Sequence, residues 1–142
     1  MRRRLWRFKN SKGKHKIRKN NQKHPGAKVS TDQLVVAQPG LVPRMDGRHT
    51  FARVCGATTF LDHYSGMSYS SLQTSLDGQQ TLAANQAFET LSDSCGVQVK
   101  SYRADNGRFA EKSFLDAVKE AHQTIYFCGV GAHHNVIIER HL

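Results

Sequence analysis

The chain has 142 residues, of which 38% are hydrophobic, and this predicts one domain with a modest core. No apolar run approaches the roughly 20 residues of a membrane span, and no apolar stretch follows the charged N-terminus, so neither a membrane protein nor a secretory signal is expected. The formal net charge of +10 favours an anionic partner, and we expect a soluble intracellular protein.

A basic arm, residues 1–28, comes first. Residues 1–30 hold twelve Lys and Arg and no acidic side chain, whereas the rest of the chain holds nine basic against eleven acidic side chains, a net −2. The arm has too few large apolar residues to offset its ordering entropy, so we expect it to be disordered when alone. Its cations can neutralise phosphates, its aromatic residues Trp6 and Phe8 can stack on bases, and its Arg/Lys blocks resemble nuclear import signals.

The arm therefore predicts a nucleic-acid contact and a location in the nucleus, the cytoplasm or both; a solubilising tail is the alternative. The predicted nucleic-acid-binding residues of the arm are Arg2, Arg3, Arg4, Trp6, Arg7, Lys14, Lys16, Arg18 and Lys19.

Three strands are expected next, after the boundary at Pro25-Gly26. VSTDQLVV (29–36) reads as a strand, residues 39–49 as a long loop rich in Pro and Gly, residues 52–66 as a second strand, and residues 67–73 as its hairpin partner.

The second half alternates helices with strands. A helix is predicted from Asp77, with a C-terminal cap at Gly96, then a strand over 97–105, a second helix, and a buried strand over 124–130. This order predicts an α/β fold, in which the later strands are parallel and the helices pack on the sheet. The expected apolar face of the first helix is Ala84, Ala87, Phe88 and Leu91, and that of the second is Ala110, Phe114, Ala117, Val118 and Ala121.

The three cysteines, Cys55, Cys95 and Cys128, are widely spaced and form no Cys-x-x-Cys pair, so we expect buried, reduced thiols. A zinc site could be imagined from Cys128 and the later histidines. Its spacing matches none of the usual ligand patterns. That set would be Cys128, His133, His134 and His141.

Carboxylates occupy unusual places in these elements. Asp105 precedes Asn106-Gly107, a strong turn dipeptide, but the following segment has a helical period, so Asp105 is expected at the carboxyl end of a parallel strand, where open α/β sheets place their ligands. Asp32 lies inside a strand, where Asp has poor β-propensity, and Glu139 follows the last strand. Converging carboxylates repel one another unless a cation neutralises them, and Mg²⁺ suits such oxygen ligands.

Five segments carry a family resemblance: VSTDQL, ATTFLDHYSG, SYRADNGRF, FCGVGAHH and IIER. Over about residues 25–142 they resemble, in order, the integrase catalytic core of copia-type retrotransposon polyproteins, which is related to retroviral integrases. The resemblance implies an RNase H-like mixed sheet, with three antiparallel strands, then strand-helix-strand units and flanking helices. The expected domains are the arm, 1–28, and a catalytic core, 29–142, which we expect to be incomplete at its C-terminus because the chain ends three residues after Glu139.

The same resemblance implies a DDE triad of Asp32, Asp105 and Glu139 that holds two Mg²⁺ or Mn²⁺ ions. It also implies 3′-end processing and strand transfer on retrotransposon DNA ends and target DNA, and a homo-oligomer in the full-length protein. Asn106, Arg108 and His133 are candidate substrate contacts, each equally readable as a turn, cap or surface residue.

Asp62 matches a residue common in the family, but we expect it to have a structural role at a strand end. Two alternatives stay open for the function, because fold does not fix chemistry. The chain could be an inactive fragment that only binds nucleic acid, or a hydrolase that acts on RNA in hybrids.

Overall fold

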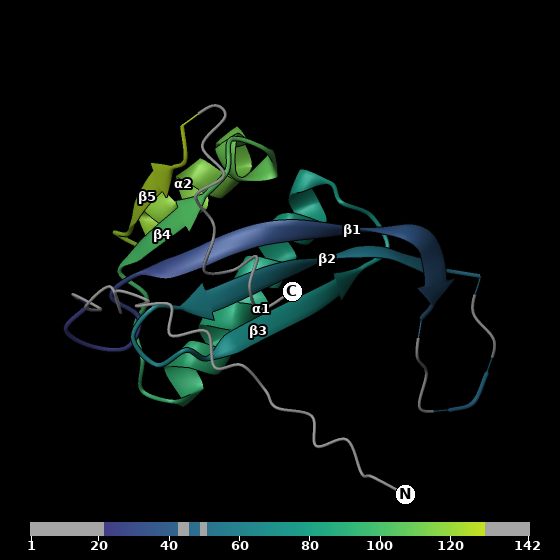
Figure 1. The fold of residues 1–142 in the computed structure, drawn as a ribbon, viewed down its shortest axis with the longest axis horizontal. Helices are drawn as coiled ribbons and strands as arrows, with labels where there is room; N and C mark the ends of the chain where they lie inside the picture. Colours follow the sequence, from purple (N-terminus) through teal and green to yellow (C-terminus); the bar gives the residue numbers. More distant parts are fainter. Residues whose placement is uncertain (1–21, 43–45, 49–50, 130–142) are drawn as a thin grey trace, which may run out of the picture.

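A computed structural model of the chain describes residues 22–42, 46–48 and 51–129. The arm up to residue 21 and residues 130–142, with Glu139 and the candidate zinc histidines, lie outside the described residues. The elements, drawn in Figure 1, are β1 (Val29–Leu41), β2 (Arg53–Asp62), β3 (Ser68–Gln73), α1 (Gly78–Ser94), β4 (Ser101–Ala104), the short 3₁₀ helix η1 (Arg108–Ala110), α2 (Lys112–Glu120) and β5 (Thr124–Phe127).

The five strands form one mixed sheet in the order β3-β2-β1-β4-β5. β1 pairs with β2, and β2 with β3, in antiparallel fashion, whereas β4 runs parallel to both β1 and β5. This confirms the predicted fold class, including the antiparallel opening and the parallel second half.

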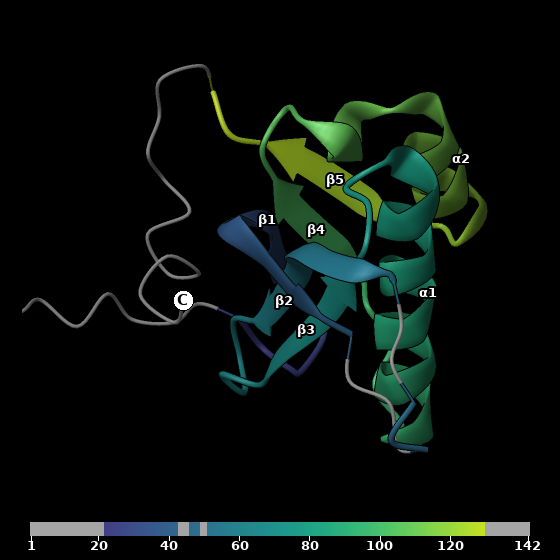
Figure 2. The ribbon, with the colours of Figure 1, turned by 90° about the vertical axis from the view of Figure 1, so that its right-hand side faces the viewer.

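The two helices α1 and α2 lie on the same side of the sheet, as Figure 2 shows. Between the sheet and these helices lies a core rich in aromatic rings. Phe60 of β2 stacks on Phe88 of α1 with 4.7 Å between ring centroids, and Phe109 meets Phe114 edge-on at 5.3 Å. We call the side of the sheet turned away from α1 and α2 the second face.

Strand β1 is longer than predicted, because it continues through Pro39 and Gly40 to Leu41. The expected loop over 39–49 is therefore wrong in its first part. An irregularity between Val35 and Gly40 shifts the register with β2 before pairing resumes at Leu41 and Arg53. A bulge of this kind accommodates a proline, whose missing N–H cannot join a regular ladder.

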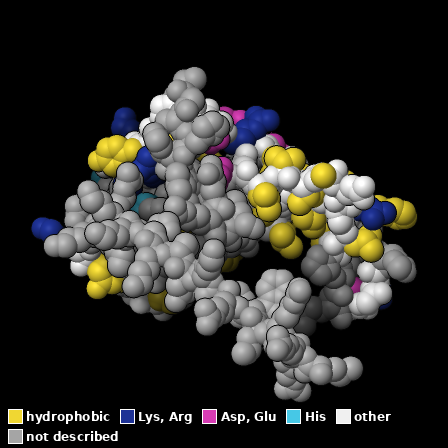
Figure 3. All heavy atoms as spheres, viewed as in Figure 1, with side chains coloured by type: hydrophobic (Ala, Val, Ile, Leu, Met, Phe, Trp, Pro, Cys, Tyr) yellow, Lys and Arg dark blue, Asp and Glu magenta, His cyan; other side chains and the backbone are white. Residues whose placement is uncertain are grey.

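The distal part of the β1–β2 ribbon projects past the helices (Figure 1). Val35, Leu41 and Phe51 are 68%, 60% and 105% exposed, and Figure 3 shows hydrophobic side chains gathered on this projection. The strand pairing persists there through main-chain hydrogen bonds, although no helix among the described elements packs on it.

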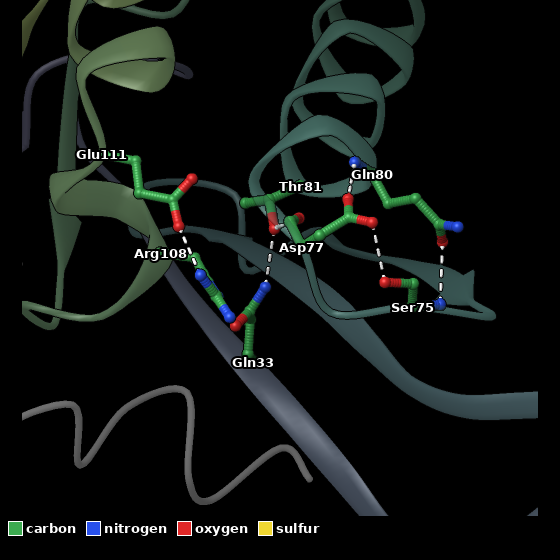
Figure 4. Close-up of polar contacts among 7 residues, drawn as sticks. All are labelled: Gln33, Ser75, Asp77, Gln80, Thr81, Arg108 and Glu111. Atoms are coloured by element: carbon green, nitrogen blue, oxygen red, sulfur yellow. Dashed lines mark hydrogen bonds and ion pairs between the residues drawn. The ribbon is translucent and has the colours of Figure 1, made fainter.

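Helix α1 has the caps that its sequence predicts. The Asp77 carboxylate accepts the N–H of Gln80 at 2.8 Å, and Ser75 donates to the same carboxylate at 2.7 Å (Figure 4). Gly96 has φ +73°, and its N–H and that of Val97 donate to carbonyls of the last turn, a Schellman arrangement.

The buried face of α1 differs in part from the prediction. Ala84 and Phe88 are buried as expected, but Ala87 and Leu91 are exposed, and small polar side chains take part of the face instead. These buried polar residues are Thr81, Asn85 and Ser92. In α2, Phe114 and Val118 are buried as expected, whereas Ala110 and Ala121 are exposed and lie outside the helix.

Other boundaries and burial classes also needed correction. β4 covers only Ser101–Ala104 of the predicted 97–105, and β5 is not buried, since it is the edge strand with Tyr126 58% exposed. All three cysteines are free, but Cys95 is exposed and the other two are half-buried. No helix in the described part of the chain is long and apolar enough to cross a membrane.

Candidate active site

The strand register brings two predicted site residues together. β1 and β4 pair in parallel at Val29 with Tyr102 and at Ser30 with Arg103. Continuing this register by two residues beyond the second pair places Asp32 level with Asp105 on neighbouring strands. Two positions that lie 73 residues apart in the sequence thus become adjacent at one place in the sheet.

The alternation of side chains assigns Asp32 to the second face. Val29 and Thr31 are fully buried, and the next odd position, Gln33, reaches helix α1, where its Nε2 donates to Thr81 Oγ1 at 2.7 Å (Figure 4). Asp32 therefore projects to the opposite side of the strand. It is half-buried, and its Oδ1 accepts the N–H of Gln33 at 2.8 Å.

Asp105 follows β4 immediately and is exposed. Its Oδ1 accepts the N–H of Gly107 at 3.3 Å, so the Asp-Asn-Gly segment makes a local bend at the end of a parallel strand. Asn106 Nδ2 donates to the carbonyl of Cys128 at 3.5 Å, which ties the bend to the chain after β5. This segment can therefore form a turn and also place Asp105 in the candidate site.

Arg108, a predicted nucleic-acid contact, already has an acidic partner. Its guanidinium forms an ion pair with Glu111 at 2.6 Å (Figure 4). The nearby Arg108 charge is also one of the smaller causes that lower the pKa of Asp77, after the hydrogen bonds from Gln80 and Ser75. Arg108 is 53% exposed, so part of it faces solvent while it links η1 to the start of α2.

Asp62 has the structural role that the sequence suggests. It is only 5% exposed; its Oδ1 accepts the N–H of Gly26 at 3.0 Å, and its Oδ2 accepts the N–H and hydroxyl of Ser65 at 2.8 and 2.6 Å. The carboxylate thus joins the segment before β1 to the turn between β2 and β3.

We expect Asp62→Ala to lower the free energy of unfolding by about 2–3 kcal/mol, because it leaves the buried Gly26 N–H without its charged acceptor. Urea unfolding followed by circular dichroism measures this, and Asp93→Ala, an exposed carboxylate on α1, is the matched control. Equal stability of the two variants would contradict the structural role of Asp62.

A three-carboxylate metal cluster is not complete within the described residues. There, no three His, Cys, Asp or Glu side chains come together as a metal-ligand group. Asp32 and Asp105 supply two carboxylates at adjacent positions, and Mg²⁺ typically takes one or two carboxylates with water and phosphate oxygens as its other ligands. The donor set fits a hard divalent cation, while Glu139 and His133 fall outside the described ranges.

Sequence reasoning missed a basic cluster beside the acid pair, formed by Lys28, His63 and Arg103. A signal was present, since Arg103 stands two residues before Asp105 and a strand returns to the same face every second residue. His63 gave no such signal, because only the sheet brings the β2–β3 turn next to the start of β1.

Comparisons with known proteins support the fold. No protein-family model and no curated protein sequence matches the chain. The HTLV-2 integrase catalytic core domain in complex with magnesium is structurally similar in its dimeric form, with a TM-score of 0.59, 15% identity, and coverage of 82% of this chain and 65% of that one. Its trimeric form has a TM-score of 0.53 and 17% identity, and the match covers 82% of this chain and 68% of that chain.

A third similar structure is the simian T-cell lymphotropic virus intasome in complex with a PP2A regulatory subunit. It has a TM-score of 0.59 and 12% identity, and the match covers 82% of this chain but 37% of that one. This chain therefore spans roughly two thirds or less of these proteins, and identities this low establish the fold alone. The chain has the RNase H-like fold of retroviral integrase catalytic cores.

Proposed function

We propose that this protein catalyses metal-dependent polynucleotidyl transfer on DNA, with Asp32, Asp105 and Glu139 as its metal-binding carboxylates. The observation that carries the proposal is the β1–β4 register, which makes Asp32 and Asp105 neighbours although 72 residues separate them. The similarity to integrase cores, one of them solved with magnesium, supports the same chemistry.

The chain's own residues hold the two carboxylates in place. The Gln33 peptide donates to Asp32 while the Gln33 side chain is tied to α1, so the strand presents Asp32 from a fixed support. The bend after β4 orients Asp105 through the Gly107 N–H and leaves it accessible to a substrate. Such positioning matters because misplacement by about 1 Å can cost roughly a hundredfold in rate.

The cations supply the chemistry that these carboxylates lack. Asp32, Asp105 and Glu139 would hold two Mg²⁺ or Mn²⁺ ions, which would supply Lewis-acid activation of an attacking water or 3′-hydroxyl and charge stabilisation of the leaving 3′-oxygen in an in-line displacement at phosphorus. No covalent intermediate with the protein is needed.

The finer parts of the proposal rest on the sequence motifs. VSTDQL, SYRADNGRF and IIER support an origin in a copia-type retrotransposon, for which the reactions would be 3′-end processing and strand transfer of retrotransposon ends into target DNA. The dimeric and trimeric forms of the HTLV-2 core support a homo-oligomer, and the three free cysteines support action in the nucleus or cytoplasm.

Binding of Mn²⁺ tests the shared site directly. Asp32→Asn and Asp105→Asn should each weaken Mn²⁺ affinity by at least the roughly 10–100-fold that loss of an outer-shell partner costs, because each removes a direct ligand. Isothermal titration calorimetry measures the affinity, with the exposed Asp93→Asn variant as control. Unchanged affinity in both site variants would rule the shared site out.

Assays of DNA binding, Mn²⁺ binding and strand cleavage separate catalysis from a role in nucleic-acid binding alone. If the protein binds DNA but neither binds Mn²⁺ nor cleaves any strand, it acts only as a nucleic-acid-binding protein. Cleavage of the RNA strand in hybrids, with DNA left intact, would instead identify a hydrolase of the same fold.

A further inference from the structure

A basic cluster lies on the second face, directly before the acid pair along the strands. Ser30 and Arg103 are register partners on β1 and β4, and each stands two residues before its aspartate. Ser30 Oγ lies 2.6 Å from His63 Nε2, and the main-chain N–H of His63 donates to the main-chain carbonyl of Lys28 at 3.0 Å. Lys28, His63 and Arg103 therefore gather from three places in the sequence around Ser30.

The charges of these basic groups repel one another. Burial and then the charge of Arg103 lower the pKa of Lys28. Burial, followed by the charges of Lys28 and Arg103, likewise lowers the pKa of His63, and these effects outweigh the opposing effect of Asp62. All three side chains are half-buried, so water screens their repulsion only in part.

Within the described part of the chain, no carboxylate is in ion-pair contact with Lys28 or Arg103. Neither Lys28 nor Arg103 forms an ion pair there; Arg103 Nε instead donates to Cys128 Sγ at 3.4 Å. The buried carboxylate of Asp62, whose charge acts on His63, already accepts hydrogen bonds from Gly26 and Ser65. An anion bound from outside would relieve the repulsion.

We propose that Lys28, His63 and Arg103 form a phosphate-binding site that holds the nucleic-acid strand beside the acid pair. The identity of the strand rests on the proposed function. Two residues of strand span about 7 Å, a distance comparable to that between neighbouring phosphates of one nucleic-acid strand. A phosphate on this site therefore places the next one at Asp32 and Asp105, and the Arg103 guanidinium suits phosphate oxygens.

This site, to which the last arm residue Lys28 contributes, has a different role from the rest of the basic arm. The arm supplies affinity for nucleic acid through its many cations. The cluster lies at a defined position in the sheet, so it determines which phosphate lies next to the carboxylates of Asp32 and Asp105. Lys28, His63 and Arg103 are thus positioning residues for the substrate strand.

The test measures binding of a short labelled single-stranded DNA by fluorescence anisotropy, in EDTA and over a series of salt concentrations. The Lys28→Gln/Arg103→Gln double variant of the full chain should lose about 0.7 from the slope of log K against log salt, the amount that one phosphate contact contributes on a single strand. The control double variant, Lys100→Gln/Lys112→Gln, removes two exposed cations elsewhere and should keep the wild-type slope.

Two further measurements separate a charge effect from a folding effect. Arg103→Lys keeps the cation but loses the guanidinium contact with Cys128, so it should retain most of the wild-type slope. The His63 imidazole signals in NMR spectra should shift on addition of inorganic phosphate in the wild type and not in the double variant. A double variant with the slope and affinity of its control, and His63 signals that do not respond to phosphate, would overturn the proposal.

Because these measurements contain no divalent cation, they are independent of catalysis. A slope that falls as expected in a protein without Mn²⁺ affinity would uphold the phosphate site and refute the proposed activity. An unchanged slope in a protein that does bind Mn²⁺ would refute the phosphate-binding site and leave the proposed activity standing.

Discussion

Replacing Asp105 or Asp32 by asparagine should lower Mn²⁺-dependent nicking of labelled DNA by at least a hundredfold. Metal-ion stabilisation of a transition state is worth several kcal/mol, and each 1.36 kcal/mol corresponds to about tenfold in rate. Asparagine keeps the size of the side chain but removes the charge that would hold the cation. The β1–β4 register predicts that the two variants lose similar amounts, because each removes one of two adjacent ligands.

The assay compares both variants with Asp93→Asn, whose carboxylate is exposed on α1. Circular dichroism and thermal unfolding verify that each variant is folded. Glu139→Gln extends the test to the third predicted carboxylate, for which the motif IIER is the only support. Nicking within a few-fold of wild type in Asp32→Asn and Asp105→Asn would refute the assignment of the active site.

Removing residues 1–21 should abolish most of the salt dependence of DNA binding. This deletion takes away ten of the twelve basic side chains of the arm. If about six of the arm's cations meet phosphates, log K falls with log salt at a slope near −5, which is about a thousandfold in affinity between 50 and 200 mM salt. The truncated chain should bind weakly and retain only the shallow slope of contacts made by the folded part.

The deletion ends at residue 21 because the chain that follows belongs to the fold. Gly26 donates to Asp62, its carbonyl accepts the Lys100 N–H at 2.8 Å, and the Ala27 carbonyl accepts the Ser101 hydroxyl at 2.6 Å. A control with the arm residues in shuffled order keeps the charge, whereas Trp6→Ala/Phe8→Ala removes stacking worth about 1–3 kcal/mol per base. A truncated chain with unchanged affinity and slope would place DNA binding on the folded domain.

Local pattern alone predicted most of the fold. The β-rich opening and the alternation of helical and strand periods specified a mixed sheet, because periods of 2 and 3.6 residues are properties of a single segment. Asp77 and Gly96 marked the ends of α1 for the same reason, since capping depends on residues within one turn. Asp105 at the end of a strand and Asp32 inside one could likewise be found from the sequence.

Several features depend on contacts between segments that lie far apart in the chain, and no single segment encodes them. β1 extends to Leu41 only because β2 offers main-chain hydrogen bonds beyond a bulge. β5 carries an apolar sequence yet lies at the sheet edge, since its burial is decided by strand order and not by composition. The buried stripe of α1 includes Asn85 because the Tyr102 hydroxyl of β4 accepts from its amide at 3.3 Å.

The sequence by itself predicted three carboxylates for the candidate site, and it predicted the strands that carry Asp32 and Asp105. Only the tertiary structure decided that Asp32 lies level with Asp105, and that Lys28, His63 and Arg103 gather beside them. The physical reason is that side-chain chemistry and periodicity are encoded locally. Proximity between residues that lie far apart in the chain arises only when strands pair, and the pairing register is set by the packing of the whole sheet.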